Sequence, residues 1–186
     1  RRGIVRVVTG GGKTLFALQC ALDAMRERPA LRVAIVVPSV ALLDQWYVDL
    51  QEELDAQPDE IHIVRSGAPP SSDARFFLAV LNTARVHGVG LPAEAPGMLV
   101  VDECHRAGAE QSRQALGGSF VATLGLSATP EREYDDALAE VLIPRLGPIV
   151  FEYSYVEAAA DGVIAPFGLV NVEVPLTAEE QDRYKK

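Results

Sequence analysis

The stretch VVTGGGKTLFAL, at residues 7–18, places three consecutive glycines between an apolar run and a segment with helical character. Glycine loses more backbone freedom on folding than any other residue, so three in a row need a structural reason. A glycine-rich turn between a strand and a helix brings backbone N–H groups and the positive end of the helix dipole together, which suits a phosphate group. The stretch therefore predicts a phosphate-binding loop between a strand and a helix.

The residue types in this loop favour a nucleoside triphosphate held together with Mg²⁺. Lys13 would reach the β- and γ-phosphates, and the hydroxyl of Thr14 would ligate Mg²⁺. The full pattern G-x-x-x-x-G-K-[ST] has glycine at position 7, where this chain has Val7. A glycine-rich turn followed by an unrelated Lys-Thr pair is the alternative. The residues predicted to bind ATP are Thr9, Gly10, Gly11, Gly12, Lys13 and Thr14.

Length, composition and charge limit the classes of protein to which the chain can belong. With 186 residues and 48% hydrophobic content, it can bury a core, and one domain, or at most two, is expected. It has no apolar run long enough to span a bilayer, so no membrane partner is expected. Cys20 and Cys104 form neither a disulfide framework nor a zinc motif, which favours the reducing cytoplasm. The net charge of −9 argues against a basic coat for nucleic acid.

Short apolar runs alternate with helical patterns along the chain. Several runs lack polar alternation, as strands buried on both faces of a parallel sheet do. The expected strands are Ile4–Val8, Val33–Val37, Ile61–Val64, Phe76–Leu81, Met98–Val101, Phe120–Leu126 and Phe167–Val174. The expected helices begin near Leu15 and at Val40, followed by Glu133–Leu142, Tyr155–Ala160 and a last one capped by Thr177 and Glu180. The pattern predicts a three-layer α/β domain with a mainly parallel sheet.

The helix that begins at Val40 shows the clearest periodicity. Its expected buried stripe is Val40, Leu43, Tyr47, Leu50 and Leu54. Trp46, on the same helix but outside this stripe, is assigned to core packing, with a platform for base stacking as the alternative.

Two adjacent carboxylates follow the apolar run Met98–Val101. In a site with a phosphate loop, Asp102 would hold Mg²⁺, directly or through water, and Glu103 would orient and deprotonate the attacking water. Solvated acids at the end of a strand are the alternative. Glu103 and Lys13 are therefore the predicted catalytic residues, and Thr14 and Asp102 the predicted metal ligands.

These motifs together resemble the first RecA-like lobe of a superfamily 2 helicase or translocase of the DExH type. TGGGKT (9–14) is similar to motif I, VVPSVALLDQW (36–46) to motif Ia, DECH (102–105) to motif II and LGLSATPER (124–132) to motif III. LNTAR (81–85) is a weaker match to motif Ib. The pattern is most similar to the excision-repair helicase and type III restriction-subunit branches.

The resemblance implies a RecA-like P-loop domain over residues 1–175, with residues 176–186 beginning the connection to a second RecA-like lobe. It implies an ATP hydrolase that couples hydrolysis to movement on DNA or to its unwinding, and that turns over slowly or not at all as this isolated lobe. His105, Ser127 and Thr129 would link the nucleotide to the nucleic acid. An RNA helicase, a restriction-system translocase, and a nucleotide-dependent switch without motor activity stay open as alternatives.

An acidic protein needs another way to hold a phosphate backbone. The resemblance assigns Pro38, Ser39 and Thr83 to that backbone, with DNA favoured over RNA. Ser39 and Thr83 each follow a predicted strand and precede a helix, where a small hydroxyl residue caps the helix and backbone N–H groups can bind phosphate. The alternative is that both residues only cap their helices.

Overall fold

A computed structural model of the chain describes residues 1–65, 69–109, 112–131 and 136–165, with residues 170, 172, 174–177, 180 and 183. Its strands are β1 (Arg2–Val7), β2 (Arg32–Val37), β3 (Ile61–Ile63), β4 (Phe76–Val80), β5 (Gly97–Val101), β6 (Ala122–Ser127) and β7 (Ile149–Tyr153). They form one sheet in the order β3-β4-β2-β5-β6-β1-β7, in which every pair is parallel. The predicted sheet is confirmed, and all its carboxyl ends meet at one edge.

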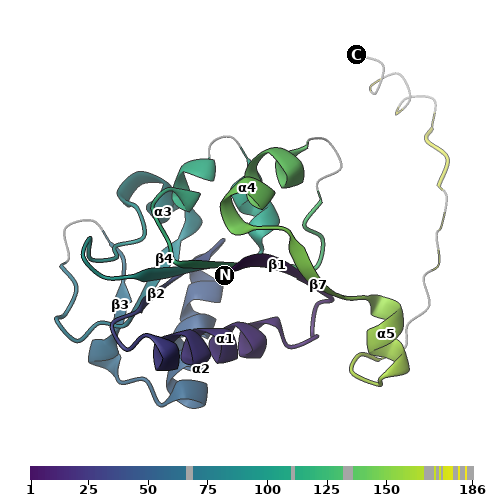
Figure 1. The fold of residues 1–186 in the computed structure, drawn as a ribbon. Coiled ribbons are helices and arrows are strands. Elements are labelled where there is room, and N and C mark those ends of the chain that lie inside the picture. The colour runs from purple at the N-terminus through teal and green to yellow at the C-terminus, as the bar shows by residue number, and fades with distance from the viewer. Residues whose placement is uncertain are drawn as a thin grey trace.

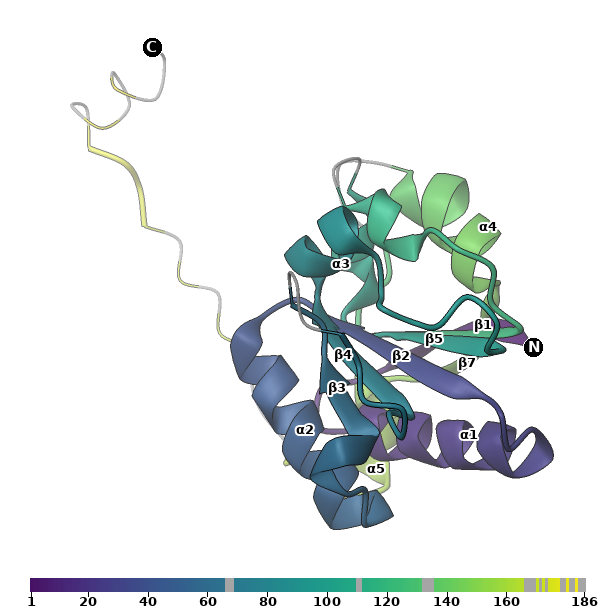
Figure 2. The same ribbon diagram turned by 90° about the vertical axis from the view of Figure 1, so that its left-hand side faces the viewer.

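Helices cover both faces of the sheet, as Figures 1 and 2 show. Helices α1 (Lys13–Glu27) and α2 (Val40–Leu54) lie on one face, α3 (Leu81–His87) and α4 (Ile143–Leu146) lie on the other, and α5 (Tyr155–Ala160) follows β7. The shorter turns are the 3₁₀ segments Pro58–Glu60, Cys104–Gly108 and Arg113–Leu116 and the π-helical segment Leu138–Leu142. The three-layer arrangement is the one that the sequence predicted. No helix in the described part of the chain is long and apolar enough to cross a bilayer.

Alternate residues of each central strand enter two separate cores. In β2, Val33, Ile35 and Val37 pack in the core shared with α1 and α2, whereas Ala34 and Val36 pack in the core beneath α3 and α4. All five are at most 1% exposed. Complete burial of a side chain of the size of Val or Ile stabilises the fold by about 1.5–3 kcal/mol. The continuous apolar runs of the sequence are explained by this burial on both faces.

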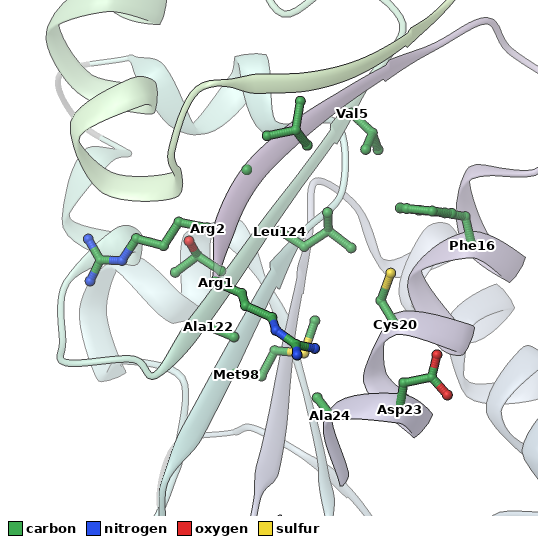
Figure 3. A pocket seen from close by; sticks show the side chains of 13 residues that line it. Arg1, Arg2, Val5, Phe16, Cys20, Asp23, Ala24, Met98, Ala122 and Leu124 are labelled. Carbon is green, nitrogen blue, oxygen red and sulfur yellow. The ribbon is translucent and has the colours of Figure 1, made fainter. Parts of the chain in front are cut away.

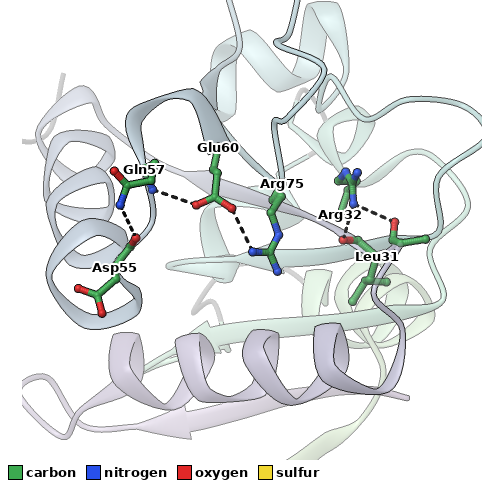
Figure 4. Close-up of polar contacts among 7 residues, drawn as sticks. Leu31, Arg32, Asp55, Gln57, Glu60 and Arg75 are labelled. Carbon is green, nitrogen blue, oxygen red and sulfur yellow. Dashed lines mark hydrogen bonds and ion pairs between the residues drawn. The ribbon is translucent and has the colours of Figure 1, made fainter.

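The β3 edge of the sheet is held by the Glu60 carboxylate (Figure 4). Arg75 donates to Glu60 Oε1 at 3.0 Å, and the Gln57 backbone N–H donates to Oε2 at 3.0 Å. The Gln57 N–H and the Arg75 guanidinium hold the pKa of Glu60 below its ordinary value. The ionised carboxylate therefore ties the start of β3 to the start of β4.

The chain after residue 130 departs from the sequence-based expectation. β7 was not predicted, yet it pairs with β1 from Ile4↔Ile149 to Val7↔Tyr153. As an edge strand it leaves Val150 59% and Phe151 53% exposed, so its short run lacks the burial pattern of the central strands.

Two other predicted elements differ in extent. The expected helix Glu133–Leu142 lies partly outside the described residues, and its described part continues past Pro144 as α4. Pro144 lies in the first turn of α4, a position at which the fixed φ of proline suits the helix. The expected strand Phe167–Val174 lies largely outside the described residues, and Val170, Val172 and Val174 are not in a strand.

Two local predictions near the end of the chain are confirmed. The helix Tyr155–Ala160 is present as α5. The Thr177 hydroxyl accepts from the Glu180 backbone N–H at 3.4 Å, and Glu180 Oε2 accepts from the Thr177 N–H at 2.9 Å, which is the reciprocal capping pattern.

Candidate functional site

The glycine loop connects β1 to α1 with two residues in the left-handed region. Gly10 has φ 81° and Gly12 has φ 80°. A Cβ on Gly12 would meet nothing within 4 Å, so the backbone conformation itself, rather than crowding, requires glycine there. Gly12 is the N-cap of α1 and has no side chain to satisfy the first N–H groups of the helix. The loop therefore presents unpaired donors at an open helix N-terminus, as a phosphate-binding loop requires.

Val7 occupies the position where the phosphate-loop pattern has glycine. It is 6% exposed and belongs to the core shared with α1 and α2. A Cβ on Gly11 would lie 2.7 Å from Val7 Cγ1, so the glycine at position 11 lets the loop close directly over the valine. The loop thus forms without glycine at position 7.

Lys13 begins α1 and folds back beneath the loop. Its Nζ donates to the carbonyl of Val7 at 3.0 Å and to that of Val8 at 3.4 Å. A phosphate would replace these neutral acceptors with charged ones, which form stronger hydrogen bonds with an ammonium group. A rotation of the Lys13 side chain would bring its charge to the bound anion.

The predicted carboxylate pair lies at the carboxyl end of β5, and its two members have different surroundings. Asp102 is 9% exposed, and its Oδ1 accepts from the Glu103 backbone N–H at 2.9 Å. Asp102 Oδ2 accepts from Trp46 Nε1 at 2.9 Å. Glu103 is half-buried and has φ 46°, a left-handed conformation that is strained for a residue with a side chain. This left-handed conformation of Glu103 turns the chain sharply after Asp102.

The third motif lies at the end of β6, which separates β5 from β1 in the sheet. The buried hydroxyl of Ser127 accepts from the Thr129 backbone N–H at 3.1 Å and lies 3.0 Å from His105 Nδ1. His105 Nδ1 is also 3.4 Å from Glu103 Oε2. The residues predicted to couple the two ligands therefore form one chain of polar contacts that begins at the predicted catalytic base.

Of the two residues predicted to contact nucleic acid from a helix N-terminus, Ser39 caps its helix and Thr83 does not. Ser39 is the N-cap of α2, and its hydroxyl accepts from the Leu42 backbone N–H at 3.4 Å. Thr83 does not cap a helix, and that part of the sequence-based hypothesis is wrong. β4 passes directly into α3 with Val80 as an N-cap that makes no side-chain hydrogen bond, so Asn82 and Thr83 lie inside the helix.

A cleft of about 560 Å³ brings the motifs together at the carboxyl edge of the sheet. Its lining residues are Thr9, Pro38, Ser39, Leu42, Glu103, His105, Arg106, Ala128, Thr129 and Tyr155. The cleft thus joins the start of the glycine loop, the N-terminus of α2 and the ends of β5 and β6. Thr83 instead lines a shallower hollow of about 340 Å³ with Arg65 and His87.

A second cavity lies at the opposite edge of the sheet, where the strands begin (Figure 3). It has a volume of about 280 Å³ and lies between α1 and the sheet, with Phe16, Cys20 and Leu124 among its lining residues. None of the predicted site residues lines it, and its walls are mainly apolar. Its polar lining includes Arg1, Arg2 and Asp23 (Figure 3), but neither the glycine loop nor the Asp102–Glu103 pair reaches it.

The donor atoms at the carboxyl edge fit ATP and Mg²⁺. Mg²⁺ binds through one or two protein oxygens together with phosphate and water oxygens. Thr14 offers a hydroxyl and Asp102 offers a carboxylate whose oxygens each keep a free lone pair after one hydrogen bond. Within the described ranges no group of three or more His, Cys, Asp or Glu side chains could hold a metal by itself. The donor set suits a metal shared with phosphate and water oxygens, and neither Thr14 nor Asp102 lines the cleft itself.

Trp46 is the contact that the sequence reasoning missed. It was correctly assigned to the core, but the expected stripe of α2 omitted it and included Val40, which is 64% exposed. The residues of α2 that are buried are Leu43, Trp46 and Leu50. The spacing of seven residues from Ser39 was the available signal, because it places Trp46 on the same side of α2 as the N-cap.

Comparisons with known proteins agree with this arrangement. The family described as type III restriction enzyme, res subunit, matches residues 1–132. The DNA 3'-5' translocase XPB2 of Sulfurisphaera tokodaii is 34% identical over 185 residues, which is 99% of this chain and 39% of that protein. The general transcription and DNA repair factor IIH helicase/translocase subunit XPB/SSL2 of Saccharomyces cerevisiae is 25% identical over 99% of this chain and 22% of its own length.

Solved structures share the fold. The Hef helicase domain of Pyrococcus furiosus has a TM-score of 0.66 and 21% identity, covering 82% of this chain and 34% of that one. The SWI2/SNF2 ATPase core of Sulfolobus solfataricus in complex with dsDNA has a TM-score of 0.64 and 18% identity, covering 86% of this chain and 34% of that one. The chain therefore spans less than two fifths of each of these four proteins.

Proposed function

The chain belongs to the type III restriction enzyme res-subunit family and has the fold of the first RecA-like lobe of superfamily 2 helicases, and we propose that it is the ATP-binding lobe of a DNA helicase or translocase. In this role it uses ATP hydrolysis to move along DNA or to separate its strands. The observation that carries the proposal is the cleft lined by Thr9, Ser39 and Glu103, because it joins the start of a phosphate loop, a helix N-terminus and a carboxylate.

The residues of the loop hold and orient the nucleotide. The backbone N–H groups around Gly10 and Gly12 bind the phosphates, and Lys13 neutralises their charge after it leaves the Val7 carbonyl. Thr14 and Asp102 hold Mg²⁺, which, when bound, neutralises charge on the phosphate oxygens. Glu103 accepts a proton from the attacking water, and the sharp turn at its backbone directs its carboxylate into the cleft.

The polar chain from Glu103 to Thr129 connects hydrolysis to the strand. His105 lies within contact of both Glu103 Oε2 and Ser127 Oγ, so a change at the carboxylate alters the hydrogen bonding at the end of β6. The Ser127 hydroxyl in turn holds the backbone N–H of Thr129. Pro38 and Ser39 face the same cleft and are placed to contact the sugar-phosphate backbone.

Backbone donors at the N-terminus of α2 explain how a chain with a net charge of −9 could hold a phosphate backbone. α2 is 15 residues long and is capped by Ser39, so its first N–H groups offer a phosphate site without lysine. Such contacts position a strand without reading bases, as motion along any sequence requires. The choice of DNA over RNA is supported by the similar proteins, which include a DNA 3'-5' translocase and an ATPase core in complex with dsDNA.

A second RecA-like lobe would complete the nucleotide cleft. In related phosphoryl-transfer proteins, an arginine supplied from outside the loop raises the rate by roughly 10³–10⁵. We place residues 176–186 at the start of the connection to that lobe, and the whole protein inside the cell. Residues 1–186 alone then bind nucleotide weakly and hydrolyse it very slowly.

The ATPase rate of the longer protein that contains this lobe tests the proposal. The rate is measured with single-stranded DNA, duplex DNA and RNA as separate stimulants, for the unchanged protein and for Glu103→Gln. DNA should raise the rate of the unchanged protein, and Glu103→Gln should abolish it while nucleotide binding persists. Stimulation by RNA alone would support the RNA helicase, and nucleotide binding without any stimulated turnover would support the switch.

Ser39→Ala and Thr83→Ala test the nucleic-acid face in the same protein. Ser39→Ala should weaken binding to single-stranded DNA, because the substitution removes the cap at the cleft. Thr83→Ala is the matched comparison, since this threonine lies inside a helix and outside the cleft. Equal DNA affinity for both variants and the unchanged protein would refute the assignment of the Ser39 end of α2.

A further inference from the structure

Trp46 joins α2 to the carboxylate at the end of β5. Its Nε1–H donates to Asp102 Oδ2 at 2.9 Å, and the two residues are 56 positions apart in the chain. Trp46 is 1% exposed and Asp102 is 9% exposed, so little water reaches this bond. The second carboxylate oxygen accepts from the adjacent Glu103 N–H. The indole is therefore the long-range contact that fixes the plane of this carboxylate among the described residues.

The pairing is specific in its chemistry. A buried indole N–H needs an acceptor, and a buried carboxylate is costly unless donors satisfy it. Leu43 and Leu50 are the other buried residues of α2, and their side chains can make only apolar contacts in the core that they share with Trp46. Any large apolar residue could fill the space of the ring, whereas only a donor at that position can hold Asp102 Oδ2.

The location of Trp46 on α2 adds a mechanical link. Ser39, Leu43 and Trp46 follow a spacing of four and three residues, which places them on one side of the helix. The Ser39 end of this side lines the cleft beside Glu103, and the Trp46 position two turns later holds Asp102. A displacement of α2 along its axis would therefore change the hydrogen bond to the carboxylate.

We infer that Trp46 is a positioning residue for the metal carboxylate: its indole N–H sets the orientation of Asp102 toward Mg²⁺ and ties that orientation to helix α2. The inference rests on the proposed function, in which Asp102 holds Mg²⁺ and the N-terminus of α2 faces the nucleic acid. Through this bond a strand that engages α2 changes the affinity of the site for Mg²⁺.

Trp46→Phe tests the inference because phenylalanine keeps an aromatic ring and removes the N–H. Binding of a non-hydrolysable ATP analogue to residues 1–186 is measured by calorimetry, over a range of Mg²⁺ concentrations and in EDTA. Loss of an outer partner of a metal ligand lowers metal affinity about 10–100-fold, so the variant should need that much more Mg²⁺ for half-maximal binding. Binding in EDTA should not change, because the phosphate loop lies on other elements.

Leu50→Val is the matched control. Leu50 is fully buried in the same core on the same helix, and its apolar side chain cannot donate a hydrogen bond to Asp102. Its substitution should lower the thermal midpoint without changing the Mg²⁺ requirement. If Trp46→Phe also lowers stability but leaves the Mg²⁺ requirement unchanged, Trp46 is only a packing residue and the inference is overturned.

A measurement on the unchanged chain does not depend on the folding of a variant. Trp46 is the single tryptophan, so one indole N–H resonance appears in a ¹H–¹⁵N spectrum. Addition of the analogue with Mg²⁺ should shift this resonance, and the analogue with EDTA should shift it far less. Binding with an unmoved indole resonance overturns the inference alone, whereas failure of the longer protein to bind the analogue under either condition overturns the proposed function and the inference with it.

Discussion

Replacing Ser127 with alanine should separate hydrolysis from its stimulation by DNA. The hydroxyl is buried, accepts from the Thr129 N–H at 3.1 Å and lies 3.0 Å from His105 Nδ1. Each hydrogen bond contributes about 0.5–1.5 kcal/mol net. Thr129 is exposed and His105 is half-buried, so water can replace part of the loss. We expect Ser127→Ala to lower the free energy of unfolding by about 1–2 kcal/mol.

Thr123→Val provides a control on the same strand. Thr123 is buried at the opposite end of β6 and donates a 2.7 Å hydrogen bond to the carbonyl of Leu146, far from the cleft residues. Its loss should cost a similar amount of stability, measured by urea unfolding of residues 1–186.

The ATPase assay of the longer protein then distinguishes the two variants. Ser127→Ala should keep the basal rate and lose most of the stimulation by single-stranded DNA, because the contact between His105 and the end of β6 is gone. Thr123→Val should keep both. Equal stimulation of the two variants at equal stability would refute the reasoning that the Ser127 hydroxyl transmits the nucleotide state.

Three further predictions concern the loop, the β3 edge and the buried thiol. Gly12→Ala should cost about 1–2 kcal/mol of stability, because φ 80° is strained for alanine, and calorimetry should show weakened nucleotide binding; unchanged stability and binding would contradict the loop geometry. Glu60→Gln should lower the free energy of unfolding at pH 7 by about 0.5–1 kcal/mol. Because the Gln57 N–H and Arg75 lower the pKa of Glu60, this contribution is present above the ordinary value of 4.5 and is lost as the pH falls through the lower folded value, so urea unfolding at acid pH should show the difference vanish. Burial, followed by the charges of Glu103 and Asp102, raises the pKa of the Cys104 thiol to about 12, so a thiol reagent at pH 8 should modify Cys104 only in denaturant, and modification in the folded chain would contradict its burial.

The sheet could be predicted from the sequence because its central strands are buried on both faces and therefore read as continuous apolar runs. The glycine loop and the Asp102–Glu103 pair could be placed at one edge of the sheet, because each follows a predicted strand and parallel strands have their carboxyl ends at the same edge. β7 escaped prediction because an edge strand carries exposed apolar residues, such as Val150 and Phe151, without a recognisable period.

The cap at Ser39 and the absence of one at Thr83 show where local patterns are sufficient and where they are not. Both residues follow a strand, but β2 ends at Val37 and Pro38 separates it from Ser39, whereas β4 continues directly into α3 at Leu81. Pro38 marks the end of β2 in the sequence, whereas no proline or glycine marks the end of β4 before Thr83. The Trp46–Asp102 bond is a stronger case, because its partners lie on elements 56 positions apart and only the packing of α2 on the sheet brings them together.

Paramagnetic relaxation by Mn²⁺ in place of Mg²⁺ tests the central claim most directly. The ion, added with a non-hydrolysable ATP analogue to ¹⁵N-labelled chain, broadens the amide resonances closest to it. The account predicts that residues 10–14 and residues 102–103 broaden together and recover together when the analogue is withheld. Broadening of one segment while the other keeps its line width would contradict a single nucleotide–metal site between them.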